Sequence, residues 1–569
     1  MASQASRPAA WIFPSLRSYT LAMLPTDALA ALVLTAIALP GQLATAKLMH
    51  LSPMAGLLAF AAGSFAFAAL GSNRFASVAA DSTIAPIMAG SLTLMVMPEN
   101  PHYAALAATL ALLVGAILLL AGVLRAGWIA DLLSVPVTTG FLAGIAVHII
   151  VGQLPTVFGV SVKPDQHVLG RFLELMQHLP DAKPIPVAIG FGVLACTLIA
   201  EWLNPRIPGS LIGLVASGLA VWWFAFDHNQ VAVLGALPLT PPTLALSLPK
   251  WSEFTQLLQL AVTVALVCMM QTAAVVRSFP SDPRQAENVS RDFGGVGAGS
   301  ILAGLLGSFA VDASPPSTAA VVESGGRTQA CSLLAILIIA VIALFAGGLF
   351  SFVPEAALAG VLMFIALRIC RIDTMRRIYL NGGIEILLVI ASAALVVIMP
   401  IQAGVAMSIG LSLLQSLYIV ARPDSAVLAR VPDTTIWWNL PAQAHGEHEP
   451  GVLVFAPGAP INFTNAYYIR DKLQAAIAKL PEPCRLVVIE ANGVINFDFT
   501  GADIMQQIIT ELRNQGIDVM LARMESEIAQ HAAERAGLLT LLGPDHVFRS
   551  VEDAIQAYRA RSKHQEKTA

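Results

Sequence analysis

Long runs of apolar residues, separated by short polar or Pro/Gly-containing breaks, fill the chain from about residue 26 to residue 421. The hydrocarbon core of a bilayer is about 30 Å thick, so a helix that crosses it needs roughly 20 mostly apolar residues. We therefore expect about fourteen helical segments. They are 26–48, 53–71, 81–97, 104–124, 129–153, 185–202, 208–226, 256–277, 293–309, 314–323, 331–351, 354–369, 382–399 and 402–421. Two of them, 81–97 and 314–323, are too short to cross a bilayer comfortably.

The pattern changes after residue 421. Strand-like runs at 452–455, 485–490 and 519–522 alternate with helix-like stretches at 466–479, 501–515 and 525–536. This alternation is typical of an α/β domain. We expect an N-terminal segment at 1–25, a membrane domain at 26–421, a linker at 422–449, an α/β domain at 450–562 and a frayed tail at 563–569.

Composition agrees with a membrane protein. The chain is 56% hydrophobic and 12% charged, with a mean hydropathy of +0.72, whereas soluble domains carry about 25% charged residues. The net charge of −4 gives no reason to expect a nucleic-acid partner. The five cysteines stand singly, so neither a disulfide framework nor a metal site is predicted. No pattern of a catalytic triad or phosphate-binding loop is present, so neither an enzyme nor a cofactor is expected.

The basic residues of the loops indicate an orientation. With the N-terminus inside, most loop arginines fall on the cytoplasmic side, and the opposite side receives Lys47, Lys163, Arg171, Lys183 and Lys250. The N-terminus and the α/β domain are therefore expected in the cytoplasm, with the helices in a bacterial inner membrane.

The two short segments begin alike, with SVAADST at 77–83 and VDASPPST at 311–318. They lie about seven spans apart, which predicts two inverted halves, a recurrent transporter architecture. An interrupted helix leaves unsatisfied N–H groups and the positive end of its dipole at its N-terminus, where an anion binds favourably. Asp and Ser could instead simply cap these helices, but the repetition of the pattern favours a binding site.

Five motifs, in order, make the chain resemble the SulP anion-permease family, whose members carry a C-terminal STAS domain. They are PGQLATA at 40–46, GSNR with SVAADST at 71–83, GGRTQ at 325–329, VPEAALAG at 353–360 and FDFTGA at 497–502. The resemblance implies a polytopic α-helical fold with a seven-plus-seven inverted repeat, like that of uracil permeases, and a C-terminal α/β STAS domain. It also implies a homodimer in membrane lipid and an elevator-like movement of a core domain against a gate domain.

The resemblance also implies a substrate site between the starts of the third and tenth helices. The residues expected there are Gln42, Thr45, Ala80, Asp81, Ser82, Thr83, Gln271, Ala313, Ser314 and Ser317.

Three positions depart from the family pattern. Gln271 stands where many members have Glu, Ser317 stands at an Arg position, and Asp312 replaces the usual Thr. The expected site thus holds two carboxylates, Asp81 and Asp312, and no basic side chain. Two ionised carboxylates would oppose anion binding, so we expect H⁺ or Na⁺ to act at Asp81 or Asp312. Alternatively, both carboxylates are helix caps that face water.

Thr500 lies in the STAS turn that carries a phosphorylatable hydroxyl in related domains, so it is either a regulatory residue or a helix cap. Taken together, these features predict secondary active transport of a small anion, with sulfate, bicarbonate and a dicarboxylate as candidates. The alternatives are a transport-impaired, membrane-anchored STAS regulatory protein, an uncoupled anion pathway and a permease for an uncharged ligand.

Overall fold

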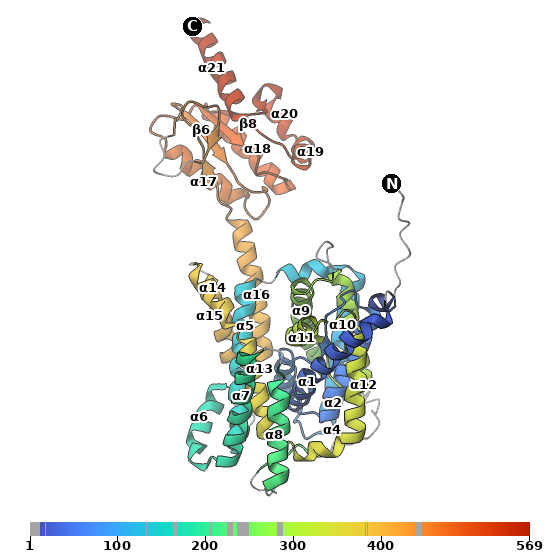
Figure 1. Cartoon of the computed structure of the whole chain (residues 1–569). Helices are drawn as coiled ribbons and strands as arrows, with labels where there is room; N and C mark the ends of the chain where they lie inside the picture. Colours follow the sequence, from blue (N-terminus) through green and yellow to red (C-terminus); the bar gives the residue numbers. More distant parts are fainter. Residues whose placement is uncertain are drawn as a thin grey trace. The chain divides into compact units, whose positions relative to one another are not determined.

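The computed structural model contains a helix within each of the fourteen expected segments (Figure 1). It describes residues 12–17, 19–132, 134–162, 168–204, 207–224, 231–235, 250–281, 288–381, 383, 385–439 and 446–568. The chain forms two compact units, Met1–Leu413 and Leu414–Ala569. Among the described residues of the whole chain, seven helices are long and apolar enough to cross a membrane.

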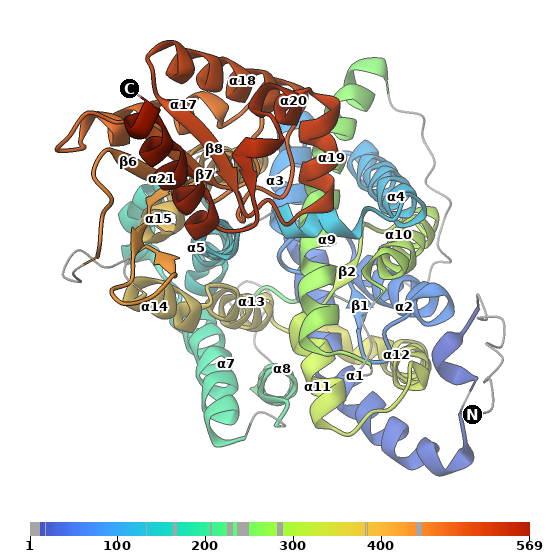
Figure 2. The same ribbon diagram turned by 90° about the horizontal axis from the view of Figure 1, so that it is seen from above.

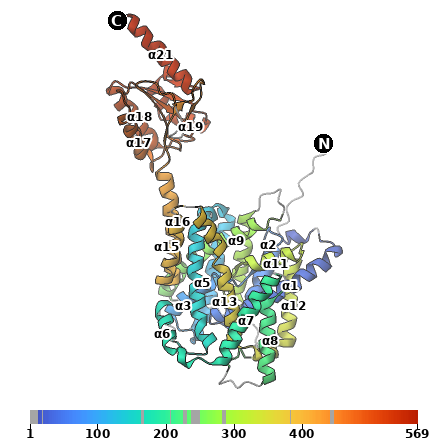
Figure 3. The same cartoon turned by 60° about the vertical axis from the view of Figure 1, so that its left-hand side comes forward.

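The helices of the first unit form two bundles, each packed mostly within itself (Figures 1 and 3). The first bundle contains α1 (Leu24–Leu48), α2 (Pro53–Leu70), α3 (Ala85–Met95), α4 (Pro101–Val123), α9 (Trp251–Ser278), α10 (Val289–Leu305), α11 (Pro315–Glu323) and α12 (Ala330–Ala346). The second contains α5 (Val135–Phe158), α7 (Pro184–Leu203), α8 (Gly209–Phe224), α13 (Glu355–Ile369) and α15 (Glu385–Ile398). Helix α1 packs against both α8 and α13 and so connects the two bundles. Helix α16 (Ile401–Ala421) contains the boundary between the two units.

Small residues bring helices of the first bundle close together. A Cβ atom added to Gly115 on α4 would lie 2.6 Å from the carbonyl oxygen of Gly297 on α10. The reverse substitution at Gly297 would place a Cβ atom 2.8 Å from the carbonyl oxygen of Gly115. Such close backbone approach is how helices pack in membranes, where lipid provides no hydrophobic drive for their association.

Two short strands interrupt the helical architecture of the first bundle. Strand β1 (Val78–Ala79) pairs antiparallel with β2 (Asp312–Ala313), and Ala79 lies opposite Asp312. Strand β1 precedes α3 and β2 precedes α11, so the two short segments predicted from the sequence meet here (Figure 2).

The membrane unit differs from the sequence expectation in three places. The segment expected at 129–153 begins instead with a 3₁₀ helix, η3 (Ala126–Leu132), and α5 starts at Val135. Pro136 explains this start, because proline fits the first turn of a helix, where its missing N–H is not needed. Two helices were not predicted, α6 (Val168–His178) and α14 (Ile372–Leu380), because they are too short and too polar to be recognised as membrane spans.

The second unit contains a five-stranded sheet in the order β3-β6-β7-β8-β9. Strands β6 (Val452–Ala456), β7 (Leu486–Glu490), β8 (Asp518–Ala522) and β9 (Val547–Phe548) are parallel, and β3 (Ala426–Val427) is antiparallel to β6. Alternate residues of the strands face two hydrophobic clusters, so both faces of the sheet are covered. The helices are α17 (Ala466–Ala478), α18 (Phe499–Asn514), α19 (Glu527–Arg535), α20 (Leu538–Leu542) and α21 (Val551–Thr568).

Two stretches of this unit contain secondary structure that the sequence analysis did not assign to them. The stretch expected to be a linker, 422–449, contains β3 and the paired strands β4 (Ala429–Arg430) and β5 (Trp437–Trp438). The tail expected at 563–569 belongs to α21 as far as Thr568.

Candidate functional site

The candidate site is built where the two interrupted segments bond to each other. Beyond the β1–β2 pair, the N–H of Ser314 donates to the carbonyl oxygen of Ser77 (2.8 Å). The N–H of Ser77 donates to Oγ1 of Thr318 on α11 (3.0 Å). In a continuous helix these backbone groups would pair with each other. Here the bonds between the two segments satisfy them, and unpaired backbone groups would be costly in an apolar bilayer.

Gln42 on α1 holds the segment after β1. Its Nε2 donates to the carbonyl oxygen of Ala80 (3.0 Å), and the N–H of Ala80 donates to its Oε1 (3.1 Å). Thr45, one turn further along α1, donates its hydroxyl to the carbonyl oxygen of Gly41 (2.8 Å). Both side chains are buried, and their polar groups act on the backbone.

A chain of hydrogen bonds connects Asp81 with helix α9. Oδ1 of Asp81 lies 2.7 Å from the N atom and 2.5 Å from Oγ1 of Thr83. The same Oγ1 lies 2.8 Å from Oε1 of Gln271, whose Nε2 donates to the carbonyl oxygen of Ala313 (3.2 Å). Gln271 therefore joins the start of the third helix to β2.

Asp312, the first residue of β2, is the second carboxylate of the candidate site. Its Oδ1 accepts hydrogen bonds from Oγ1 of Thr272 (3.0 Å) and from the N–H of Ala313 (2.7 Å). Its side chain is fully buried, and Oδ2 has no hydrogen-bond partner among the described residues.

The remaining predicted residues lie at the starts of the two short helices. Ser314 is the N-cap residue of α11, and its Oγ lies 3.1 Å from Oγ of Ser317 in the first turn. Ser82 lies in the turn before α3 and is buried. Within the described part of the chain, no acceptor is found for the backbone N–H groups of Asp81, Ser82 and Ile84 before α3 or of Ser317 in the first turn of α11. Both interrupted segments therefore carry N–H groups of the kind that bind anions at helix starts.

Four polar residues that the sequence analysis did not single out position the site. Oδ1 of Asn73 accepts from the N–H groups of Phe75 (2.9 Å) and Ala76 (2.8 Å), which shapes the loop before β1. Gln329 reaches the same loop from beyond α11, and its Nε2 donates to the carbonyl oxygens of Asn73 (3.2 Å) and Ala76 (2.8 Å). Asp292 on α10 accepts from the N–H groups of Ser72 (2.6 Å) and Asn73 (3.1 Å).

The fourth residue, Asp27 on α1, fixes the loop that follows α11. Its Oδ1 accepts from the N–H of Arg327 (2.7 Å), and its Oδ2 accepts from Oγ1 of Thr328 (2.7 Å). Two of the four residues, Asn73 and Gln329, lie in the GSNR and GGRTQ motifs, so the sequence could have indicated them. The GGRTQ motif also contains Thr328, the partner of Asp27. Both motifs serve to hold the interrupted segments in place.

Thr500 lies in the second unit, in the first turn of α18. The N-cap of this helix is Asp498, whose Oδ1 accepts from the N–H of Gly501 (2.7 Å) and whose Oδ2 accepts from the N–H of Phe463 (2.8 Å). The capping alternative for Thr500 is therefore wrong. A phosphate on Thr500 would lie at the positive end of the helix dipole, and its regulatory role stays a prediction.

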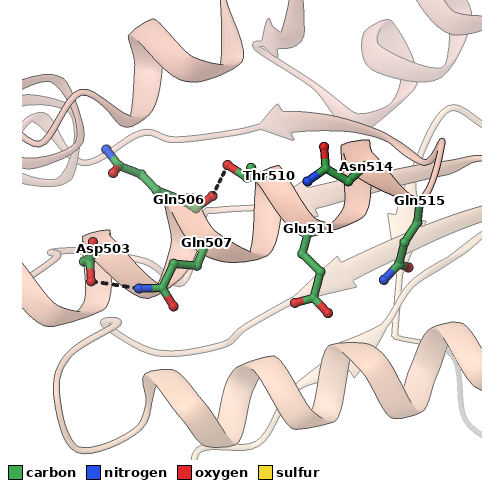
Figure 4. A pocket seen from close by; sticks show the side chains of 7 residues that line it. All are labelled: Asp503, Gln506, Gln507, Thr510, Glu511, Asn514 and Gln515. Carbon is green, nitrogen blue, oxygen red and sulfur yellow. Dashed lines mark hydrogen bonds between the residues drawn. The ribbon is translucent and has the colours of Figure 1, made fainter.

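Helix α18 also lines an open hollow of about 560 Å³ in the second unit (Figure 4). The side chains around it are Asp503, Gln506, Gln507, Thr510, Glu511, Asn514 and Gln515. Nε2 of Gln507 donates to Oδ2 of Asp503 (2.9 Å). With two carboxylates and no basic group among these side chains, the hollow does not suit an anion. Among the described residues, no cluster of His, Cys, Asp or Glu is placed to hold a metal ion.

Comparison with known proteins identifies relatives for both units. Residues 24–392 match the sulfate permease family, and residues 444–554 match the STAS domain. The chain is 33% identical over 549 residues to a probable sulfate transporter of Mycobacterium tuberculosis, covering 96% of this chain and 97% of the relative. It is 22% identical to probable sulfate transporter 3.5 of Arabidopsis thaliana, covering 96% and 88% of the two chains.

Solved structures show the same fold. The structure of SLC26A9 superimposes with a TM-score of 0.86 at 18% identity, covering 97% of this chain and 93% of that one. The transmembrane domain of the cyanobacterial bicarbonate transporter BicA gives a TM-score of 0.60 at 19% identity, covering 70% of this chain and 98% of that one. Both expectations from the sequence, a polytopic helical membrane fold and a C-terminal STAS domain, are confirmed.

Proposed function

The chain belongs to the sulfate permease family and carries a STAS domain, and on this premise we propose that it is a secondary active transporter of a small anion. The observation that carries the proposal is that both interrupted segments have backbone N–H groups, among them those of Ser82 and Ser317, with no acceptor among the described residues. Strands β1 and β2 hold the two segments together. Such N–H groups bind oxyanions and carboxylates without a basic side chain.

Among the anions considered, sulfate has the strongest support, because the relatives that match most of the chain are named as sulfate transporters. Bicarbonate and a dicarboxylate share the same chemistry, since their oxygens accept hydrogen bonds from N–H and hydroxyl groups. The site also offers the hydroxyl groups of Ser314 and Ser317, which lie 3.1 Å apart. Pro315 and Pro316 contribute no N–H, so the number of donors from α11 is small.

The two bundles support an elevator-type mechanism. The interrupted segments belong to the first bundle, and the second bundle meets it chiefly through α1. Movement of the first bundle along the second would carry the site, with its anion, from one side of the membrane to the other. We place the N-terminus and the STAS domain on the cytoplasmic side of the inner membrane, following the loop charges, and we propose a homodimer as the working unit.

Counterflow in proteoliposomes tests this function. Purified protein is reconstituted in vesicles preloaded with unlabelled sulfate, bicarbonate or succinate, and entry of the same labelled anion is measured. We expect entry of at least one anion. Ser317→Leu, which replaces the hydroxyl with a larger apolar side chain, should abolish it, whereas the matched Ser252→Leu on the exposed start of α9 should retain it. Entry of none of the three anions into vesicles that contain folded wild-type protein would refute the proposal.

A further inference from the structure

The two short contacts of the Thr83 hydroxyl need one more hydrogen atom than is present when Asp81 is ionised. Oγ1 of Thr83 lies 2.5 Å from Oδ1 of Asp81 and 2.8 Å from Oε1 of Gln271. A hydroxyl group carries a single hydrogen, so it donates one conventional hydrogen bond. If Asp81 were ionised, both neighbours would be acceptors, and one of the two short contacts would contain no hydrogen.

The amide orientation of Gln271 decides which contact lacks the hydrogen. Nε2 of Gln271 lies 3.2 Å from the carbonyl oxygen of Ala313, which can only accept. Rotating the amide would place Oε1 against this carbonyl oxygen, so the hydrogen-bond network assigns Oε1 to the side of Thr83. The Thr83 hydroxyl then donates to Gln271, and the contact between Thr83 and Asp81 becomes a hydrogen bond when Asp81 carries the hydrogen.

The surroundings of Asp81 fit a neutral carboxyl group. It faces Thr83 on its own segment, Gln271 and Cys268 on α9, and Asp312 on β2. This set contains a second carboxylate and no cation. Two negative charges in a dry site, next to an anionic substrate, repel one another strongly, and a proton on Asp81 removes one of them.

We propose that Asp81 is the proton-carrying group of the transport cycle, with Thr83 as its hydrogen-bond relay to Gln271. The proposal rests on the transport function proposed above and names its coupling ion. A proton from the solution binds Oδ1 of Asp81 before the anion binds, crosses with the anion and the first bundle, and returns to water after the anion leaves. No covalent bond other than the O–H bond forms or breaks.

The geometry distinguishes Asp81 from Asp312. Asp81 lies two residues after the end of β1 and one residue before Ser82, whose N–H has no acceptor among the described residues, and so next to the expected anion. Both carboxyl groups are buried, and the Oδ1 atom of each has two hydrogen-bond partners, so the position of Asp81 beside Ser82 is what sets it apart from Asp312. A sodium ion at Asp81 would compete with the Thr83 N–H, 2.7 Å away, and with the Thr83 hydroxyl for Oδ1.

Infrared difference spectroscopy during a pH titration tests protonation without depending on transport. We expect a protonated-carboxyl band in wild-type protein that diminishes as the pH rises. It should be absent in Asp81→Asn and present in the matched Asp312→Asn. Thr83→Val should shift the titration, and Thr83→Ser, which keeps the hydroxyl, should restore it. A band that survives in Asp81→Asn and disappears in Asp312→Asn would overturn the assignment.

Accumulation in proteoliposomes tests coupling in the wild-type chain. With the membrane potential held at zero, one proton per anion predicts that a gradient of one pH unit drives accumulation approaching about tenfold. A sodium gradient should have no effect. Accumulation that follows sodium and not pH would overturn the proposal while leaving anion transport intact. Absence of counterflow in wild-type protein would instead refute the transport function, even if the infrared band were assigned to Asp81.

Discussion

Gln42 shows how a single side chain acts in this site through the backbone. Its amide satisfies both the N–H and the carbonyl group of Ala80, the residue between β1 and Asp81. Removing a partner from a buried polar group costs about 1–3 kcal/mol. We expect Gln42→Ala to lower the melting temperature of the detergent-solubilised protein and to weaken anion counterflow. The matched Gln256→Ala, on an exposed position of α9, should change neither, and an unaltered Gln42→Ala protein would contradict this role.

At the scale of residues, the sequence predicted which segments meet better than it predicted what each side chain does there. The repeated Asp/Ser pattern placed residues 77–83 and 311–318 together, and the structure joins them through the β1–β2 pair, which the sequence did not predict. The positioning role of Asp292 was not predictable, because its partners in the loop before β1 lie more than 200 residues away in the sequence and it belongs to no recognised motif. Only the tertiary fold brings such partners together.

At the scale of elements, an ion pair links the two bundles. Lys47, near the end of α1, pairs with Glu355, the first residue of α13. Both side chains are partly exposed, so the pair contributes about 0.2–1 kcal/mol. If the bundles move against each other, a free energy of this size changes the equilibrium constant between their two positions by up to a few-fold. We expect Lys47→Glu to alter the counterflow rate by a similar factor.

The charge-swapped double variant, Lys47→Glu with Glu355→Lys, is the control, since it restores an ion pair with reversed polarity. It should return the rate toward that of the wild type. A double variant no closer to the wild type than Lys47→Glu alone would show that Lys47 acts independently of Glu355.

Helices with a long apolar sequence were predicted from the sequence, and short or amphipathic elements were not. Each long apolar run contains a helix because lipid forces the backbone to satisfy its own hydrogen bonds. Helices α6 and α14 were missed, because a short amphipathic helix lacks the uninterrupted apolar run on which the prediction depended. The edge strand β3 was missed because two residues carry too little pattern to recognise.

At the scale of the whole molecule, the proposed orientation predicts which loops are reached from outside the cell. Ser252 at the start of α9 and Asn381 after α14 are both exposed on the protein surface. With the N-terminus inside, they lie on opposite sides of the membrane. We expect a membrane-impermeant maleimide to label Ser252→Cys in intact cells and to label Asn381→Cys only after the cells are opened. The reverse labelling pattern would show that the N-terminus lies outside the cell.

The central claim, that an anion binds between the two interrupted segments, is tested most directly by substrate protection of a cysteine placed at Ser317. The rate of its alkylation by a small maleimide is measured in Ser317→Cys, relative to the parent chain, with sulfate, bicarbonate, succinate or gluconate present. We expect a transported anion to slow the reaction several-fold and the larger gluconate to leave it unchanged. The same anion should leave the alkylation of Ser252→Cys unchanged. An alkylation rate at position 317 that is the same with and without every anion would contradict the claim.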